Sequence, residues 1–345
     1  MHCASLRAKN SSRQSSPDGR DRNMTAAEAK KQGVALLGGF SSSPELDVSV
    51  LLSNLLGVGR SALAAHPELE MGSLETRFFE LIERRRLGVP VAYLTGVKEF
   101  WALPFHVTPD VLIPKPDTEI LVERAIDLLK RFTSTRGIPA QAGGQLPAQA
   151  LDHSPAQAAG PIHVLDVCTG SGCIAISLKH ACPRVHATAT DISEAALAVA
   201  RHNATVLLGN PEAVTFLHGD LRDGLPPCRR AQPPDSTSPV LSTEGWSLIV
   251  SNPPYVPTKQ AQALLLDGRS EPLLALDGGT DGLDLVKPLV RHAFGALSRG
   301  GYLLVETGEY NAAKAAEYFK HTGFIDILIH RDLENQERVV EGRKP

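Results

Sequence analysis

The chain has 345 residues, of which 42% are hydrophobic and 21% charged, a composition typical of a globular protein that buries a substantial core. This length predicts one large domain together with a smaller one. The 35 basic and 38 acidic residues give a formal net charge of -3, which disfavours the basic stripe expected of a protein that binds duplex nucleic acid. Because the chain has no apolar run of about 18 residues, we expect no membrane-spanning helix.

The five cysteines are scattered and include no CxxC pair and no Cys/His pair at zinc-binding spacing. We therefore expect reduced thiols and no metal site.

Residues 1–23 are rich in arginine and serine and contain only two acids, Asp18 and Asp21. This composition is typical of an organelle transit peptide and predicts a mitochondrial location. The alternatives are a plain disordered tail and a true start at Met24.

Residues 24–90 are predicted to form a small helical bundle. Helical spacing of apolar residues appears over 26–37, 44–57 and 71–86, and glycines follow the first and second of these stretches. Residues 91–111 alternate loosely and contain four aromatic side chains, which predicts a β-hairpin connector.

Residues 112–345 alternate between strand and helix patterns, apart from two low-complexity stretches near 135–160 and 226–245 that are predicted to be disordered insertions. The alternation predicts an α/β fold in which helices cover both faces of a mainly parallel sheet. Ligands in such sheets bind at the carboxyl ends of the strands. The expected strands are 162–167, 185–190, 213–218, 246–251, 301–306, 324–330 and 337–341; the expected helices are 171–181, 194–208, 284–297 and 311–321.

A glycine-containing loop joins the first of these strands to its helix. Gly170 and Gly172 permit a tight turn and the close approach of a ligand, and Asp166 lies at the end of the strand beneath them. Asp191 ends the second strand, where an acid can hold both hydroxyls of a ribose. Asp220 follows the third strand, where an adenine ring is expected.

The dinucleotide fingerprint GxGxxG is absent, and three acids would repel a pyrophosphate. They favour a cofactor with a ribose and a cationic amino group, which indicates S-adenosylmethionine. The set resembles the sites of class I methyltransferases. The predicted cofactor-binding residues are Asp166, Cys168, Thr169, Gly170, Ser171, Gly172, Asp191, Ile192, Asp220, Leu221 and Asn252.

Residues 252–255, Asn-Pro-Pro-Tyr, follow the fourth expected strand. Asn252 offers both an amide donor and a carbonyl acceptor, and Tyr255 offers an aromatic face. These groups suit a planar amide or amine. The alternative is a purely structural role as a turn that ends the strand, because Asn-Pro and Pro-Pro are common in loops.

Further motifs narrow the interpretation: Arg85-x-x-Gly88-x-Pro90-x-x-Tyr93-Leu-Thr-Gly96, Glu99-Phe-Trp101, Leu112-Ile-Pro-x-Pro-Asp-Thr-Glu119 and Leu304-Val-Glu-Thr-Gly308. With the preceding helical module, they resemble the HemK/PrmC family of protein-(glutamine-N5) methyltransferases from about residue 45 to the end. The resemblance implies a class I, Rossmann-like methyltransferase fold with a seven-stranded sheet, preceded by a helical bundle that recognises substrate. It departs at Cys168, where the family usually has glycine, and at Lys115, where arginine is commoner.

Family members methylate the Gly-Gly-Gln loop of peptide chain release factors, so the resemblance implies a class I release factor as partner, with no direct nucleic-acid contact, and we expect a monomer. It also implies catalytic and substrate-binding roles for the loop, with Lys115 and Asp117 as further substrate contacts. We hypothesise that Asn252 and the Pro253 carbonyl accept the two amide hydrogens of the glutamine while Tyr255 packs on its face. The implied catalytic residues are Asn252, Pro253 and Tyr255; the implied substrate-binding residues are Asn252, Pro253, Pro254, Tyr255, Lys115 and Asp117.

Three rival functions stay open. The same loop could methylate a flipped adenine at N6 or another nucleic-acid amine. A related enzyme could modify a glutamine of a ribosomal protein. A catalytically inactive assembly factor could also retain the fold. The tripeptide Gly143-Gly144-Gln145 mimics the expected substrate, which we attribute to chance in a Gly/Gln/Ala-rich stretch.

Overall fold

The computed structural model describes residues 23–134, 161–228, 245–266 and 271–345. These residues form two compact units that divide after Arg86, and each is described by itself. Residues 1–22 of the stretch expected to be a transit peptide (1–23), the expected insertion 135–160 with its Gly-Gly-Gln, and residues 229–244 of the second expected insertion lie outside the described residues.

The first unit is helical over its described part. Its α-helices are α1 (Ala26–Leu37), α2 (Pro44–Leu56), α3 (Arg60–Ala65) and α4 (Glu75–Arg86), with a 3-10 turn η1 (Gly72–Leu74) before α4. Thr25 begins α1 in a capping box with Glu28. Gly33 allows close packing of α1, because a Cβ there would lie 2.9 Å from the ring of Phe78. Helix α3 has a single buried side chain, Leu63, which explains why no apolar period predicted it.

The stretch 91–111 is only partly the expected hairpin. It begins with a short helix α5 (Val91–Thr95), and the antiparallel strands β1 (Val97–Phe100) and β2 (Leu103–His106) follow. Pro90 presets the start of the helix and Gly96, at φ 73°, ends it in the left-handed region, so these two residues override the strand preference of the segment. Tyr93 then anchors the turn by donating its hydroxyl hydrogen to the Val111 carbonyl at 2.6 Å.

The large sheet has seven strands in the order β5-β4-β3-β6-β7-β9-β8. Strands β3 to β7 pair in parallel, and β9 runs antiparallel to both of its neighbours. The prediction of a seven-stranded, mainly parallel sheet is confirmed. The strands are β3 (His163–Val167), β4 (His186–Asp191), β5 (Val214–His218), β6 (Trp246–Ser251), β7 (Leu297–Glu306), β8 (Ile325–Arg331) and β9 (Glu337–Arg343).

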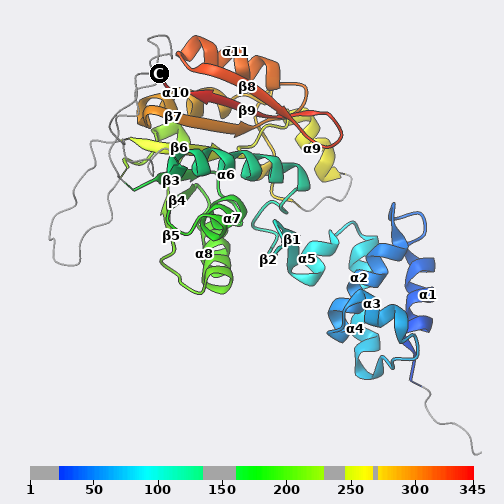
Figure 1. Ribbon diagram of the computed structural model, residues 1–345. Helices are drawn as coiled ribbons and strands as arrows, with labels where there is room; N and C mark the ends of the chain where they lie inside the picture. The colour runs from blue at the N-terminus through cyan, green and yellow to red at the C-terminus, as the bar shows by residue number, and fades with distance from the viewer. Residues whose placement is uncertain (1–22, 135–160, 229–244, 267–270) are drawn as a thin grey trace, which may run out of the picture. The chain divides into compact units, whose positions relative to one another are not determined.

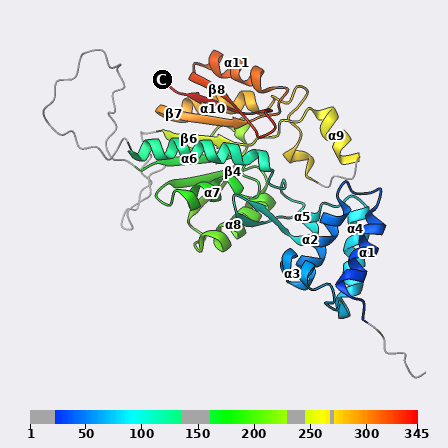
Figure 2. The ribbon, with the colours of Figure 1, turned by 45° about the vertical axis from the view of Figure 1, so that its right-hand side comes forward.

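Helices cover both faces of this sheet (Figures 1 and 2). On β3 the faces alternate residue by residue: Val164 belongs to the core beneath α6 and α7, and Leu165 to the core beneath α10 and α11. The second unit also contains the helix α9 and three 3-10 turns among its described residues. The helices are α6 (Glu119–Ser134), α7 (Cys173–Ala181), α8 (Glu194–Leu208), α9 (Thr258–Leu266), α10 (Val286–Ala296) and α11 (Ala312–Thr322); the turns are η2 (Pro116–Thr118), η3 (Leu221–Asp223) and η4 (Leu273–Ala275).

The order of the strands reverses between β3 and β6. The chain builds outward from β3 through β4 to β5, then returns to place β6 on the other side of β3. In open α/β sheets such a reversal leaves a crevice at the carboxyl ends of the two strands. Across the described ranges, no helix combines the length and apolar character needed to cross a membrane.

Candidate active site

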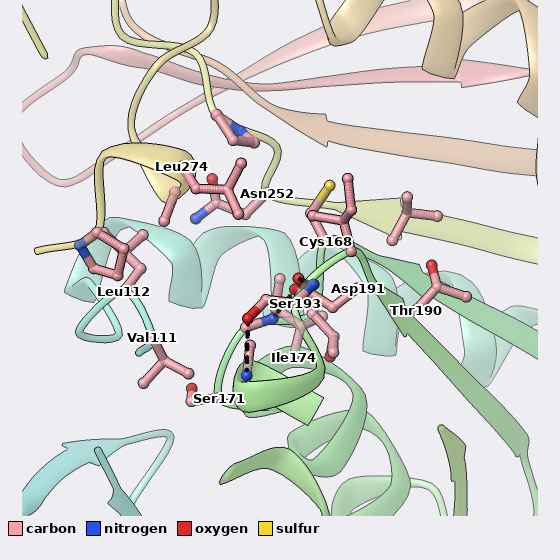
Figure 3. Close-up of a pocket in the computed structure, with 18 of the residues that line it drawn as sticks. Val111, Leu112, Cys168, Ser171, Ile174, Thr190, Asp191, Ser193, Asn252 and Leu274 are labelled. Carbon is pink, nitrogen blue, oxygen red and sulfur yellow. Dashed lines mark hydrogen bonds between the residues drawn. The ribbon is translucent and has the colours of Figure 1, made fainter. Parts of the chain in front are cut away.

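A cavity of about 280 Å³ opens at the carboxyl ends of β3, β4 and β6. In Figure 3, Asp191 and Ser193 lie on one side of it, and Asn252 and Leu274 lie on the other. Of the residues predicted to bind the cofactor, Asp166 and Gly172 do not line the cavity. Those that do are Cys168, Thr169, Gly170, Ser171, Asp191, Ile192, Asp220, Leu221 and Asn252.

The loop after β3 turns tightly, with positive φ at Cys168 (61°), Gly170 (54°) and Gly172 (81°). A Cβ at Gly172 would lie 2.8 Å from Ile176 Cδ1, so this glycine permits close packing beneath the loop. A Cβ at Gly170 would meet nothing within 4 Å. Gly170 therefore leaves open space for a ligand beside the backbone.

Asp166 supports this loop from below. Its carboxylate is fully buried and accepts hydrogen bonds from Thr169 Oγ1 at 2.6 Å and from the Ala175 amide at 3.1 Å. Burial raises the pKa of Asp166 to about 7, and these two hydrogen bonds oppose the rise. Its second oxygen, Oδ1, has no hydrogen-bond partner among the described residues. Asp166 therefore supports the glycine loop from beneath without lining the cavity.

Asp191 lines the cavity at the end of β4. Its two carboxylate oxygens accept from the amides of Gly170 at 2.8 Å and Ser193 at 2.9 Å. Burial raises its pKa, and the backbone hydrogen bonds act against that rise. Asp220 begins η3 and accepts from the Arg222 amide at 2.9 Å. Asp191 and Asp220 thus line the cavity where the adjacent strands β4 and β5 end, and Asp110 adds a third carboxylate to the lining. This arrangement is suited to hydroxyl and amino groups and unfavourable for phosphate.

The Asn252-Pro-Pro-Tyr loop leaves β6 on the opposite wall. Asn252 and Pro254 line the cavity, and Asn252 Nδ2 donates to Thr118 Oγ1 at 3.2 Å. Pro253 is buried, and neither it nor Tyr255 is among the lining residues. The Tyr255 hydroxyl instead donates to Glu306 Oε1 at 3.1 Å, behind the loop.

Lys115 and Asp117, the other two expected substrate contacts, lie in different surroundings. Lys115 lines the cavity, where its ammonium group pairs with the buried carboxylate of Glu271 at 2.6 Å. Asp117 is not a lining residue and pairs with Arg338 at 3.2 Å. The structure thus brings Lys115 to the cavity and directs Asp117 elsewhere.

Two features of the site are not evident from the sequence. One is an apolar wall of the cavity, formed by Val111, Leu112, Leu274 and Ala275. The other is the contact of Thr118 with Asn252. Leu112 and Thr118 belong to the motif Leu112-Ile-Pro-x-Pro-Asp-Thr-Glu119, which indicated the family but not the place of these two side chains in the site. No local period indicates that residues so far apart in sequence share one cavity.

The fold and the site define a class I S-adenosylmethionine-dependent methyltransferase: a seven-stranded sheet, an open glycine loop after β3, and carboxylates after β4 and β5. Sequence comparison agrees. Residues 28–96 match the PrmC N-terminal domain, and residues 164–246 match a methyltransferase domain.

The chain belongs to the family of release factor glutamine methyltransferases. It is 39% identical over 287 residues to a "Release factor glutamine methyltransferase" of Moorella thermoacetica, covering 83% of this chain and 86% of the relative. It is 32% identical over 304 residues to the Escherichia coli protein of the same name, covering 88% and 93%. A solved methyltransferase of Pyrococcus furiosus has a TM-score of 0.42 at 16% identity, covering 72% of this chain and 91% of that one.

Proposed function

We propose that this protein transfers a methyl group from S-adenosylmethionine to the side-chain amide nitrogen of the Gly-Gly-Gln glutamine of a class I peptide chain release factor. The observation that carries the proposal is the position of Asn252. Its carboxamide stands on the cavity wall opposite the Asp191 side, after a strand whose end adjoins the glycine loop. The relatives named above support the choice of substrate.

The cavity fits the cofactor on two counts. Gly170 leaves its surroundings open, and the carboxylates of Asp191 and Asp220 face the space as acceptors for hydroxyl and amino groups. When bound, S-adenosylmethionine supplies an electrophilic methyl group on its sulfonium.

The protein's own contribution is to orient the glutamine amide. Its nitrogen is a poor nucleophile, because its lone pair is delocalised into the carbonyl. Asn252 lines the cavity, and its Oδ1 accepts an amide hydrogen and directs the lone pair towards the methyl group. Val111, Leu112 and Leu274 exclude water around the amide. Catalysis rests on positioning and electrostatics without a covalent intermediate, and the product loses its proton after transfer.

The role of Tyr255 in this scheme is indirect. Its hydroxyl is held by Glu306, and its carbonyl accepts from Asn311 Nδ2 at 3.4 Å. These bonds pin the loop, so that Tyr255 fixes the position of Asn252 on the cavity wall.

The test uses purified protein, labelled S-adenosylmethionine and a release factor, either wild type or with the Gly-Gly-Gln glutamine changed to alanine. Label should enter only the wild-type factor. Asn252→Ala should lose transfer while it still binds the cofactor by calorimetry. Parallel reactions replace the release factor by nucleic acid or by a ribosomal protein. Label in nucleic acid would favour an amino-methyltransferase, and label in the ribosomal protein would favour a ribosomal-protein glutamine methyltransferase. Cofactor binding without transfer to any of these substrates would favour an assembly factor.

We further propose that the first unit recognises the release factor, that the protein acts as a monomer without binding nucleic acid, and that it works in mitochondria. The family match over residues 28–96 supports the first point, and the near-neutral net charge supports the absence of nucleic acid. The Arg- and Ser-rich composition of residues 1–23 supports the location. Fusing residues 1–23 to a fluorescent reporter tests the location, and a cytosolic reporter would contradict it.

A further inference from the structure

A buried polar group stands behind the proposed substrate loop. Thr118 ends η2 and is 1% exposed, and Glu306 ends β7 and is fully buried. Thr118 Oγ1 accepts from Asn252 Nδ2, and Glu306 Oε1 accepts from the Tyr255 hydroxyl. Thr118 therefore contacts the Asn252 end of the Asn252-Pro-Pro-Tyr loop, and Glu306 contacts its Tyr255 end.

The direction of these hydrogen bonds decides which end of the Asn252 carboxamide faces the cavity. A carboxamide has two donors on nitrogen and an acceptor oxygen, and the neighbouring hydrogen bonds select its orientation. With Nδ2 turned to Thr118, Oδ1 is left for the cavity. The opposite orientation would present a donor to the substrate amide, whose nitrogen also carries hydrogens.

Glu306 fixes the polarity of Thr118 in turn. A hydroxyl can donate one hydrogen bond while it accepts others, whereas an ionised carboxylate only accepts. Tyr255 occupies Glu306 Oε1, and the other oxygen, Oε2, is buried without a hydrogen-bond partner among the described residues. The hydroxyl of Thr118 lowers the pKa of Glu306 and so favours its ionised form. When its hydrogen points to Glu306, Thr118 has only lone pairs to offer Asn252.

We propose that Thr118 and Glu306 are positioning residues that hold the Asn252 carboxamide with its oxygen towards the cavity. The inference rests on the proposed function, since that oxygen accepts a hydrogen of the substrate amide. Both residues act through Asn252.

The arrangement predicts a pH dependence. Burial raises the pKa of Glu306 to about 7, although Thr118 and Tyr255 lower it. Protonated Glu306 becomes a donor, so that Thr118 can turn its own hydrogen to Asn252 and release the carboxamide. Turnover should therefore fall as the pH drops through about 7. The titratable or charged groups that face Glu306 are Tyr255 on the loop, Asp117 on η2, Arg338 on β9 and Cys173 on α7.

The first test compares Thr118→Val, which keeps the shape but removes the hydroxyl, with Thr118→Ser, which keeps the hydroxyl. Thr118→Val should lower kcat on the order of 10²-fold, the scale of a misplaced reacting group. Its KM, cofactor affinity and Tm should stay close to those of Thr118→Ser, and Thr118→Ser should turn over near the wild-type rate. An unchanged kcat in Thr118→Val would overturn the proposal.

The second test is independent of activity. The side-chain amide signal of Asn252 in a ¹⁵N–¹H spectrum, assigned by its loss in Asn252→Ala, should shift in Thr118→Val and stay in place in Thr118→Ser. An identical Asn252 signal in the wild type, Thr118→Val and Thr118→Ser would overturn the positioning role of Thr118. This outcome does not depend on whether the wild-type protein methylates a release factor. A wild-type protein that methylates no release factor would refute only the proposed function.

The third test addresses Glu306. Glu306→Gln cannot ionise, so its kcat should lose the acid limb that the wild type shows near pH 7. Asp166 also has a pKa of about 7. A limb that persists unchanged in Glu306→Gln would therefore assign it to Asp166 and overturn the role of Glu306.

Discussion

Replacing Gly172 by alanine should destabilise the second unit by about 2–5 kcal/mol. Gly172 has a φ of 81°, a left-handed conformation that costs a residue with a Cβ about 1–2 kcal/mol. The added methyl group would also lie 2.8 Å from Ile176 Cδ1 and 3.1 Å from Ala200 Cβ, and overpacking of this kind typically costs about 1–3 kcal/mol.

Gly170→Ala is the matched control. Gly170 has a φ of 54°, but a Cβ there would meet nothing within 4 Å. This variant therefore carries only the backbone strain, about 1–2 kcal/mol. The difference between the two variants isolates the steric cost under the loop, about 1–3 kcal/mol.

Urea unfolding followed by tryptophan fluorescence measures both variants. The two tryptophans, Trp101 and Trp246, lie beyond Arg86, so the signal reports on the second unit alone. Equal losses in Gly170→Ala and Gly172→Ala would refute the steric part of the reasoning. A loss below about 1 kcal/mol in both would also refute the strain.

Three further predictions concern other residues. Cys168→Gly should stay within about 1 kcal/mol of wild-type stability and still bind cofactor. Glycine relieves the strain of the positive φ at this position, which offsets the lost side-chain packing and the greater entropy of the unfolded chain. A stability loss above about 2 kcal/mol in urea unfolding would contradict this. Burial favours protonation of Glu341, but hydrogen bonds from Arg124 and His330 prevail and lower its pKa from 4.5 to about 2. This shift contributes about 3 kcal/mol of stability that is present above about pH 4.5 and lost as the pH falls towards 2. The difference in free energy of unfolding between the wild type and Glu341→Gln, measured by urea titration, should therefore narrow between pH 7 and pH 2.5. Asp191→Asn should weaken cofactor binding about 10- to 100-fold in calorimetry, the loss expected for charge-assisted hydrogen bonds, and unchanged affinity would exclude the carboxylate from the cofactor site.

The local parts of the fold could be predicted from the sequence, because they depend on neighbours along the chain. The apolar runs around Val164 and Ile249 predict buried parallel strands, since both of their faces are covered. Gly170 and Gly172 mark a tight turn because positive φ is readily available to glycine. The strand prediction for residues 91–95 is wrong for an equally local reason: Pro90 and Gly96 set the two ends of a helix more strongly than the β-branched and aromatic residues between them favour a strand.

The partners of the site residues could not be predicted in this way. Asn252 meets Thr118, which is 134 positions away in the chain, and Lys115 meets Glu271, which is 156 positions away. Such contacts depend on the register of the sheet and on the order in which strands return to it, and these are settled by packing of the whole unit.

The sequence by itself determined the class of fold, the carboxyl-end location of the chemistry and the side chains available there. Only the tertiary structure decided which of them face the cavity. It turned Asn252 towards the cavity and the Tyr255 hydroxyl towards Glu306, and it gave Asp117 to Arg338. The physical reason is that a buried polar side chain must find a hydrogen-bond or ionic partner, and the partners come from strands and turns that are remote in sequence.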